Sequence, residues 1–176
     1  ISVALKAAGY SINTHDKAAL QSAYHLLRKQ QPFVSAYQLS FAAIADSNIG
    51  KDVAAAMVYS GDFYALQQNS PYKDWTYVVP EEGSPLWLDC MTILKTSQHR
   101  NEAARFLAFL TRPDIAILNG KILGFTPALQ KSYLPPAILT NPVIYPPLRQ
   151  LQRSEFYNAD VSGDALRSAI YFAVLK

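Results

Sequence analysis

The sequence predicts an α/β fold, and three stretches of the chain support this class. Residues 53–59 (VAAAMVY) are continuously apolar and lie between Gly50 and Gly61, which is typical of a buried parallel strand. The turn that follows leads into a predicted helix over 62–68, so strand, turn and helix alternate along the chain. Residues 86–94 (LWLDCMTIL) are the most β-like stretch, and helical patterns follow them.

Two helices are predicted before the first of these strands. Residues 3–8 have the pattern of a helix end closed by Gly9, and we expect the beginning of that helix to lie further upstream. Asp16 is placed to cap a second helix over 17–30, which Pro32 ends. Four apolar side chains of this helix recur at the spacing of one buried stripe, namely Leu20, Ala23, Tyr24 and Leu27.

Shorter elements are predicted around the first strand. Residues 33–37 have the composition of a short strand, and residues 41–46 that of a short helix. Asp62 is placed to cap the helix that runs to 68, because its carboxylate can accept from the first backbone amides. Residues 75–79 predict a further strand before the β-like run that begins at 86.

The C-terminal part of the chain predicts helices and loops. Asn101 is placed to cap a helix that ends near 110, and a second helix over 113–123 begins at a proline and is closed by Gly124. Several prolines over 127–147 indicate a loop-rich section with short helices. Residues 163–176 predict a final helix, whose apolar stripe is Leu166, Ile170 and Val174.

Composition excludes several classes of protein. Half of the 176 residues are apolar and 16% are charged, so the chain has enough apolar side chains for a core. The net charge is only +3 and the basic residues are scattered, so a nucleic-acid-binding face is not expected. No apolar run approaches the roughly 20 residues that cross a bilayer. The one cysteine excludes an internal disulfide.

No catalytic or metal-binding pattern is present, so we expect neither an enzyme nor a cofactor. The sequence has no nucleophile elbow, no phosphate-binding glycine loop and no paired histidines at metal-ligand spacing. His15, His25 and His99 are isolated from one another and are expected to be ordinary surface or core residues. Cys90 lies in the β-like run and is expected to be a small buried apolar residue.

Trp87 and Asp89 form the most informative pair of residue types. Alternate residues of a strand share a face, so the indole and the carboxylate are predicted to project together, while Leu88 and Cys90 face the opposite layer. An ammonium group gains roughly 0.5–2 kcal/mol over a Trp face and roughly 1.5–3 kcal/mol from a charge-assisted hydrogen bond. The pair therefore predicts a receptor for a cation. The alternative is a core Trp beside an Asp that backbone donors satisfy.

Several short motifs occur in an order that resembles a known family. They are GYSINTHD at 9–16, YSGD at 59–62, YVVPEEGSPLWLDCMTIL at 77–94, and the RPDIA and LGFTPA segments within 112–128. Together they resemble the spermidine/putrescine-binding protein family of ABC importers, over nearly all of the chain. Each motif is short, but the ordered set is fairly specific.

The resemblance implies a ligand site of five residues. Trp87 and Asp89 stand for the aromatic wall and the carboxylate that hold an amine, and Tyr59 stands where a second aromatic ring encloses the ligand's methylene chain. Phe125 replaces a residue that is often Tyr in polyamine binders, and Tyr157 falls near a position that is often Gln. These departures leave the identity of the ligand open. The alternative for Tyr59, Phe125 and Tyr157 is a packing role.

The resemblance also implies a periplasmic-binding-protein-like architecture of two α/β lobes that close on the ligand. Residues 1–89 correspond to the first part of the second lobe, 90–132 to a segment that crosses into the first lobe, and 133–176 to the return into the second lobe. The N-terminal half of the family pattern, with most of the first lobe, is missing. We therefore expect weak binding by this chain alone, and either further residues in the full-length protein or a homodimer of the fragment.

The function that follows is capture of a polyamine or a similar cationic small molecule in the periplasm. The expected partners are the ligand and the membrane subunits of an ABC importer. The alternative is a periplasmic amine-sensing domain of a membrane signalling protein. A transmembrane helix and a cytoplasmic catalytic domain after residue 176 favour sensing, whereas a chain end soon after that residue favours transport.

Overall fold

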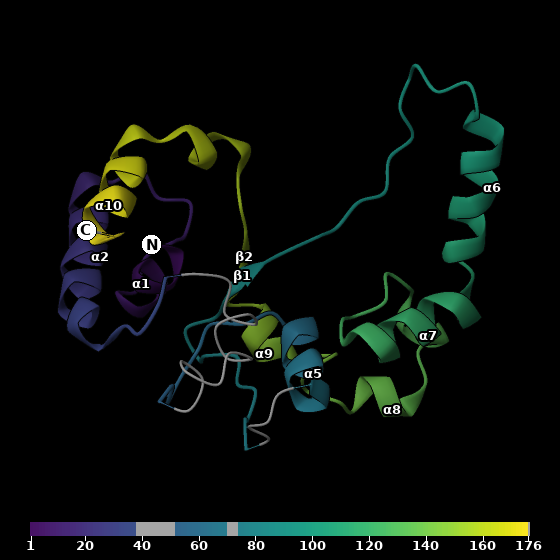
Figure 1. The fold of residues 1–176 in the computed structure, drawn as a ribbon, viewed down its shortest axis with the longest axis horizontal. Coiled ribbons are helices and arrows are strands. Elements are labelled where there is room, and N and C mark those ends of the chain that lie inside the picture. Colours follow the sequence, from purple (N-terminus) through teal and green to yellow (C-terminus); the bar gives the residue numbers. More distant parts are fainter. Residues whose placement is uncertain (38–51, 70–73, 176) are drawn as a thin grey trace. The chain divides into compact units, whose positions relative to one another are not determined.

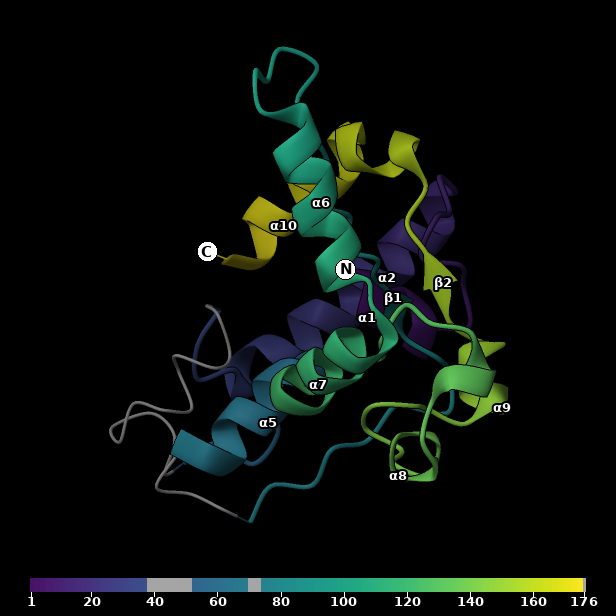
Figure 2. The same cartoon turned by 90° about the vertical axis from the view of Figure 1, so that its right-hand side faces the viewer.

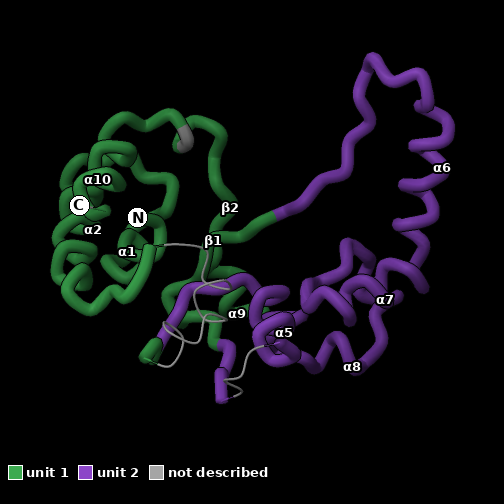
Figure 3. Tube along the Cα trace, viewed as in Figure 1, with its two compact units in different colours: residues 1–54, 78–87, 147–176 green, residues 55–77, 88–146 purple. Residues whose placement is uncertain are grey.

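The computed structural model describes residues 1–37, 52–69 and 74–175, which fall into two compact units (Figure 3). Unit 1 is formed by Ile1–Ala54, Val78–Trp87 and Pro147–Lys176. Unit 2 is formed by Ala55–Tyr77 and Leu88–Pro146. Each unit is thus assembled from separate stretches of sequence, and the correspondence of these stretches to lobes stays a prediction.

Three helices form the core of unit 1. Helices α1 (Ser2–Ala7) and α10 (Ala165–Leu175) both pack against α2 (Lys17–Gln30), and their mutual arrangement is visible in Figure 1. The predicted cap of α2 is confirmed, since the Asp16 carboxylate accepts from the amides of Ala18 and Ala19. The buried core residues are Ala4, Leu5, Ala19, Leu20, Ala23, Ile170 and Val174.

The stripe predicted for α10 is only partly correct. Ile170 and Val174 are buried, whereas Leu166 is 38% exposed and Arg167 is buried in its place. The reason is polar: the Arg167 guanidinium donates to the carbonyl oxygens of Ile12 and Thr14, and these bonds turn this side of the helix inward. A hydrophobic pattern alone does not reveal such a contact.

Unit 1 also contains a two-stranded parallel sheet. Strand β1 (Pro85–Leu86) pairs with β2 (Glu155–Phe156), with Pro85 opposite Glu155 and Leu86 opposite Phe156. The remaining short elements of this unit are η1 (Gln31–Phe33), α9 (Leu148–Leu151) and η3 (Ala159–Gly163). Parallel pairing of residues 70 positions apart agrees with the predicted α/β class, but the sheet is much smaller than expected.

Most of the predicted strands are not formed. No strand occurs over 53–59 or 75–79, and of the run 86–94 only Leu86 is in a strand. Residues 33–37 are a helical turn and bends instead. The side chains of 54–57 are exposed, and an apolar run becomes a buried strand only where neighbouring elements pair with it and cover it.

All the regular elements in the described part of unit 2 are helices, and they are joined by long irregular stretches. Its elements are α5 (Ser60–Asn69), α6 (Arg100–Leu110), α7 (Pro113–Leu123), η2 (Lys131–Tyr133) and α8 (Pro136–Leu139). Helices α5 and α7 lie side by side (Figure 2). Leu134, Ile138 and Ile144 form the buried core. The predicted bounds of α7 are confirmed, and Gly124 ends it with a left-handed φ of 70°.

Two helix starts differ from prediction. Helix α5 begins at Ser60, so Asp62 lies in its first turn, where its carboxylate accepts from the Tyr59 amide. Helix α6 begins at Arg100, one residue before the predicted cap Asn101. The helix predicted over 41–46 lies outside the described residues. No helix in the described part of the chain has the length and apolar content needed to cross a membrane.

Candidate ligand site

Two of the five predicted site residues lie at the same end of the sheet. Because Leu86 pairs with Phe156 in a parallel register, Trp87 and Tyr157 are each the next residue beyond paired positions. Both side chains are largely exposed, at 61% and 45%. The carboxyl ends of parallel strands are the usual place for ligands in α/β proteins. The pairing brings together two aromatic residues that are 70 positions apart in the sequence.

The strand pair is held in place by polar contacts and a close backbone approach. The Ser84 amide donates to the Ser154 hydroxyl, and the Glu155 amide donates to the Ser84 carbonyl. Gly83 has a φ of +90°, and a Cβ at this position would lie 2.1 Å from the Arg153 carbonyl oxygen. Only glycine allows the two segments to approach this closely.

Glu155 connects β2 to the first helix and to the loop after it. Its carboxylate accepts from the Lys6 ammonium at 2.8 Å, from the Ser11 hydroxyl and from the Ile12 amide. Burial raises the pKa of Glu155, but the hydrogen bonds from Lys6 and Ser11 and the Lys6 charge outweigh it, so the net pKa is lowered. The strand that precedes Tyr157 is therefore fixed by a charged contact.

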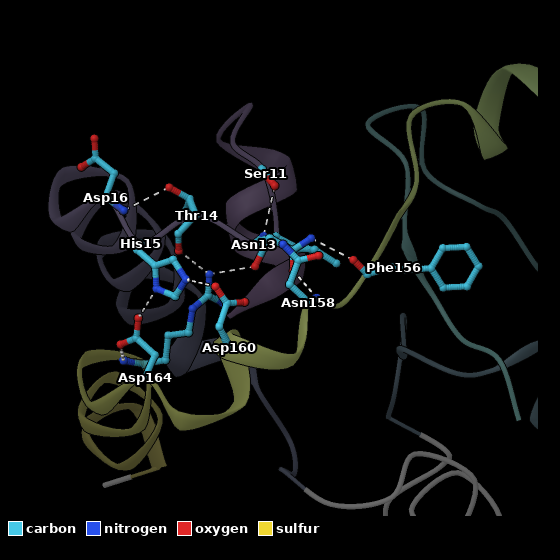
Figure 4. A network of polar contacts seen from close by, with 11 residues as sticks. Ser11, Asn13, Thr14, His15, Asp16, Phe156, Asn158, Asp160 and Asp164 are labelled. Carbon is cyan, nitrogen blue, oxygen red and sulfur yellow. Dashed lines mark hydrogen bonds and ion pairs between the residues drawn. The ribbon is translucent and has the colours of Figure 1, made fainter. Parts of the chain in front are cut away.

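Tyr157 is bracketed by contacts from one loop residue (Figure 4). The Asn13 side chain donates to the Phe156 carbonyl and accepts from the Asn158 amide, each at 2.8 Å. The Tyr157 hydroxyl donates to the Ser2 hydroxyl at 2.8 Å. The backbone on both sides of Tyr157 is thus positioned by the loop between α1 and α2.

Tyr59 and Phe125 belong to unit 2 and lie on either side of the contact between helices α5 and α7. Tyr59 directly precedes α5, and Phe125 follows the glycine that ends α7. A Cβ on Gly61 would lie 2.6 Å from the Leu123 carbonyl oxygen, so the start of α5 touches the end of α7. The two aromatic residues, 59% and 44% exposed, are therefore on either side of one contact.

An anionic group lies beside Tyr59. The Asp62 carboxylate accepts from the Tyr59 amide at 3.2 Å. Burial first, and the negative charge of Asp62 second, raise the pKa of the nearby Tyr77 phenol. The Tyr77 ring also packs against Phe63 in a tilted arrangement, with ring centroids 5.5 Å apart. Asp62 thus adds negative charge next to an exposed aromatic ring, which suits a cationic guest.

Asp89 is exposed and lies outside any helix or strand. The reasoning that placed it on one strand face with Trp87 is wrong, because the strand ends at Leu86. Cys90 and Leu88 are exposed rather than buried, for the same reason. Trp87 belongs to unit 1 and Asp89 to unit 2. Their joint role in binding stays a prediction that rests on the resemblance.

Other polar features do not coincide with these five residues. A surface hollow of about 370 Å³ in unit 1 is lined by Lys6, Gly9, Glu82, Gln152, Arg153 and Glu155, none of which was predicted to bind ligand. No group of three or more potential metal ligands occurs among residues 1–37, 52–69 and 74–175. Sequence reasoning also missed Asn13 and Glu155, whose partners are more than 140 positions away.

Comparison with known proteins relates nearly all of the chain to solute-binding proteins. The chain is 33% identical over 172 residues to a spermidine/putrescine-binding periplasmic protein of Salmonella typhimurium, which covers 96% of the chain and 47% of that protein. It is 34% identical over 104 residues to a norspermidine sensor of Vibrio cholerae, covering 59% of the chain and 29% of the sensor. The chain thus spans about half the length of the first of these relatives.

A solved structure agrees with these matches. The substrate-binding protein of the spermidine/putrescine ABC transporter of Streptococcus pneumoniae superposes with a TM-score of 0.78 at 25% identity, over 99% of this chain and 52% of that one. The fold is therefore that of a periplasmic binding protein, in part. Residues 2–146 also match the family model of the bacterial extracellular solute-binding proteins. By fold and by sequence, the chain belongs to the bacterial extracellular solute-binding protein family.

Proposed function

We propose that this chain is part of a binding protein that captures a polyamine, or a similar cationic small molecule, outside the cytoplasm for an ABC importer. The observation that carries the proposal is the position of Trp87 and Tyr157, one residue beyond the paired residues of two parallel strands. Two exposed aromatic side chains at the carboxyl end of a sheet offer flat surfaces to an alkyl ammonium. Polyamine binding by the named relatives supports the same ligand class.

In this proposal the acidic and aromatic residues have separate roles. The rings of Trp87, Tyr157, Tyr59 and Phe125 cover the methylene chain, and the indole also attracts an ammonium group. Asp89 accepts a charge-assisted hydrogen bond from a terminal ammonium. No covalent step is involved, so the protein binds and releases its ligand unchanged.

Calorimetric titration of the full-length protein with putrescine, cadaverine, spermidine and unrelated amino acids tests the ligand class. We expect heat with at least one polyamine and none with the amino acids. Asp89→Asn removes a charge-assisted bond of roughly 1.5–3 kcal/mol and weakens binding about 10- to 100-fold. Trp87→Ala weakens it several-fold or more, because the cation–π contact alone is worth roughly 0.5–2 kcal/mol.

Matched controls separate site effects from general ones. Phe33→Ala removes another exposed aromatic ring of unit 1, 85% exposed, and Asp114→Asn removes another exposed carboxylate of unit 2. Both are expected to bind like the wild type. No heat with any amine contradicts the ligand class, and unchanged binding in both Trp87→Ala and Asp89→Asn contradicts the site.

The second candidate function is amine sensing, and the similarity to the norspermidine sensor favours it specifically. The two functions share the ligand and differ in its fate. Uptake of labelled spermidine into cells that lack the full-length protein distinguishes them. Loss of uptake supports transport, whereas unchanged uptake with an altered response to external amine supports sensing.

A further inference from the structure

The side chains of Asn13, His15 and Arg167 tie the loop between α1 and α2 to the part of the chain that follows β2. Figure 4 shows Asn13 and His15 with their partners. Asn13 holds the backbone on both sides of Tyr157. Arg167 of α10 donates to the carbonyls of Ile12 and Thr14, at 2.8 and 2.6 Å. The third tie is His15, and it is the only one of the three whose charge changes near neutral pH.

His15 lies between two carboxylates that belong to different parts of the segment. Its Nδ1 is 3.0 Å from Asp164, which directly precedes α10, and its Nε2 is 3.2 Å from Asp160 in η3. An ionised carboxylate only accepts hydrogen bonds, and a neutral imidazole has one N–H to donate. Both contacts together therefore require the imidazolium form. The geometry assigns a positive charge to His15 when the two contacts are made.

The charged groups around the His15 imidazole favour its protonated form. Asp160 and Asp164 attract the proton, and partial desolvation of the ring opposes its binding. The Arg167 guanidinium also lies against this loop, where it donates to the Thr14 carbonyl. On its own element, Asp16 is engaged with the first amides of α2. The hydrogen bond to Asp164 first, and that to Asp160 second, raise the pKa of His15. The Arg167 amide first, and His15 second, lower the pKa of Asp164.

We propose that His15 is a pH-dependent latch that orders the backbone carrying Tyr157, so that the ligand site is better formed in mildly acidic than in alkaline surroundings. On deprotonation one of the two contacts is lost. Asp164 is also held by the Arg167 amide at 3.0 Å, so the contact to Asp160 is the one that opens. Asp160 lies three residues after Tyr157, so loss of its contact with His15 loosens the backbone that carries the Tyr157 side chain. The link to ligand binding rests on the proposed function.

The sign of the pH effect follows from the direction of both shifts. Because the pKa of His15 is raised in the folded protein, its contribution is complete below the ordinary value of 6.5 and is lost as pH rises through the folded value. Because the pKa of Asp164 is lowered, its contribution persists above 3.8 and is lost only as pH falls through its folded value. Both contributions are thus present at pH values between 3.8 and 6.5, where the latch is closed.

Amide hydrogen exchange of the full-length protein without ligand tests the latch directly. The variant His15→Gln retains a single side-chain donor group and so resembles the neutral ring. At about pH 5.5 we expect exchange over 157–164 to be several-fold faster in the variant than in the wild type, and at about pH 8.5 to be equal in both. Comparing the two proteins at each pH removes the intrinsic pH dependence of exchange.

Two further variants and one binding measurement complete the test. Asp160→Asn is expected to behave like His15→Gln, and His25→Gln, on the exposed side of α2, like the wild type. If the ratio of exchange rates between His15→Gln and the wild type is the same at both pH values, or if His25→Gln shows the same change, the latch proposal is overturned. In calorimetry the spermidine affinity of His15→Gln should be a few-fold below the wild type at acidic pH only. If the wild type binds no amine, the proposed function fails while the exchange ratio still decides the latch.

Discussion

At the scale of single residues, Arg167 is the buried charge on which the α1–α2 loop depends. It is 7% exposed and donates to two carbonyl oxygens of that loop. Arg167→Ala leaves these acceptors without their charged donor, and we expect a loss of roughly 1.5–3 kcal/mol of unfolding free energy. Urea unfolding measures it. Arg167→Lys keeps the charge and should recover part of the loss; equal stability of Arg167→Ala and the wild type contradicts the role.

Glu155 makes a second residue-scale prediction, on pH. Its pKa is lowered in the folded protein, so its contribution to stability is present above the ordinary value of 4.5 and is lost as pH falls through the folded value. Glu155→Gln should therefore be less stable than the wild type at neutral pH, and the difference should shrink in acid. Urea unfolding at both pH values checks this. Glu102→Gln, an exposed change on α6, is the control and should show no such pattern.

At the scale of elements, substitutions at three glycines distinguish two reasons for requiring glycine: a positive φ and a lack of space for a Cβ. Gly83 has φ +90° and no room for a Cβ, Gly9 has φ +80° with open space, and Gly163 has neither restriction. We expect Gly163→Ala to be neutral, Gly9→Ala to cost about 1 kcal/mol, and Gly83→Ala to cost more, because β1 and β2 must also separate. Thermal unfolding of the three variants ranks them. Equal stability of Gly83→Ala and Gly9→Ala contradicts the role of close approach in strand pairing.

The helices could be predicted from the sequence because their signals are local. Asp16, the stripe on α2 and the proline and glycine at the ends of α7 act within a few residues of the helix they define. Strands depend on partners elsewhere in the chain, so the apolar run 53–59 predicted a strand that is not formed. The pairing of residues 85–86 with 155–156 has no local signal at all.

The candidate site was predictable in part for the same reason. The residue types of Trp87 and Asp89 predicted a cation receptor, and the ordered motifs indicated the family. The shared strand face predicted for these two residues is wrong, because the strand ends at Leu86. Trp87 and Tyr157 are neighbours because Leu86 pairs with Phe156, and no sequence motif predicts this pairing. His15 was expected to be an ordinary residue, because its partners Asp160 and Asp164 are about 150 positions away.

At the scale of the whole molecule, the five proposed site residues belong to two units, and the chain passes between these units more than once. Trp87 and Tyr157 are in unit 1, and Tyr59, Asp89 and Phe125 are in unit 2. Under the proposed function both sets contact the ligand, so substitutions in either set are expected to weaken binding.

Exposed apolar side chains of α6 and α7 predict the solution behaviour of the 176-residue chain. Phe106 and Ile122 are 60% and 59% exposed, and α6 has no buried residue. Helices α6 and α7 contact one another, and exposed apolar side chains on neighbouring helices favour association in water. We therefore expect the isolated chain to self-associate with rising concentration in sedimentation velocity. The double variant Phe106→Gln, Ile122→Gln should sediment closer to a monomer with unchanged helix content by circular dichroism. Phe33→Gln, which removes a more exposed ring outside this surface, should not. A wild-type chain that stays monomeric at all concentrations contradicts the prediction.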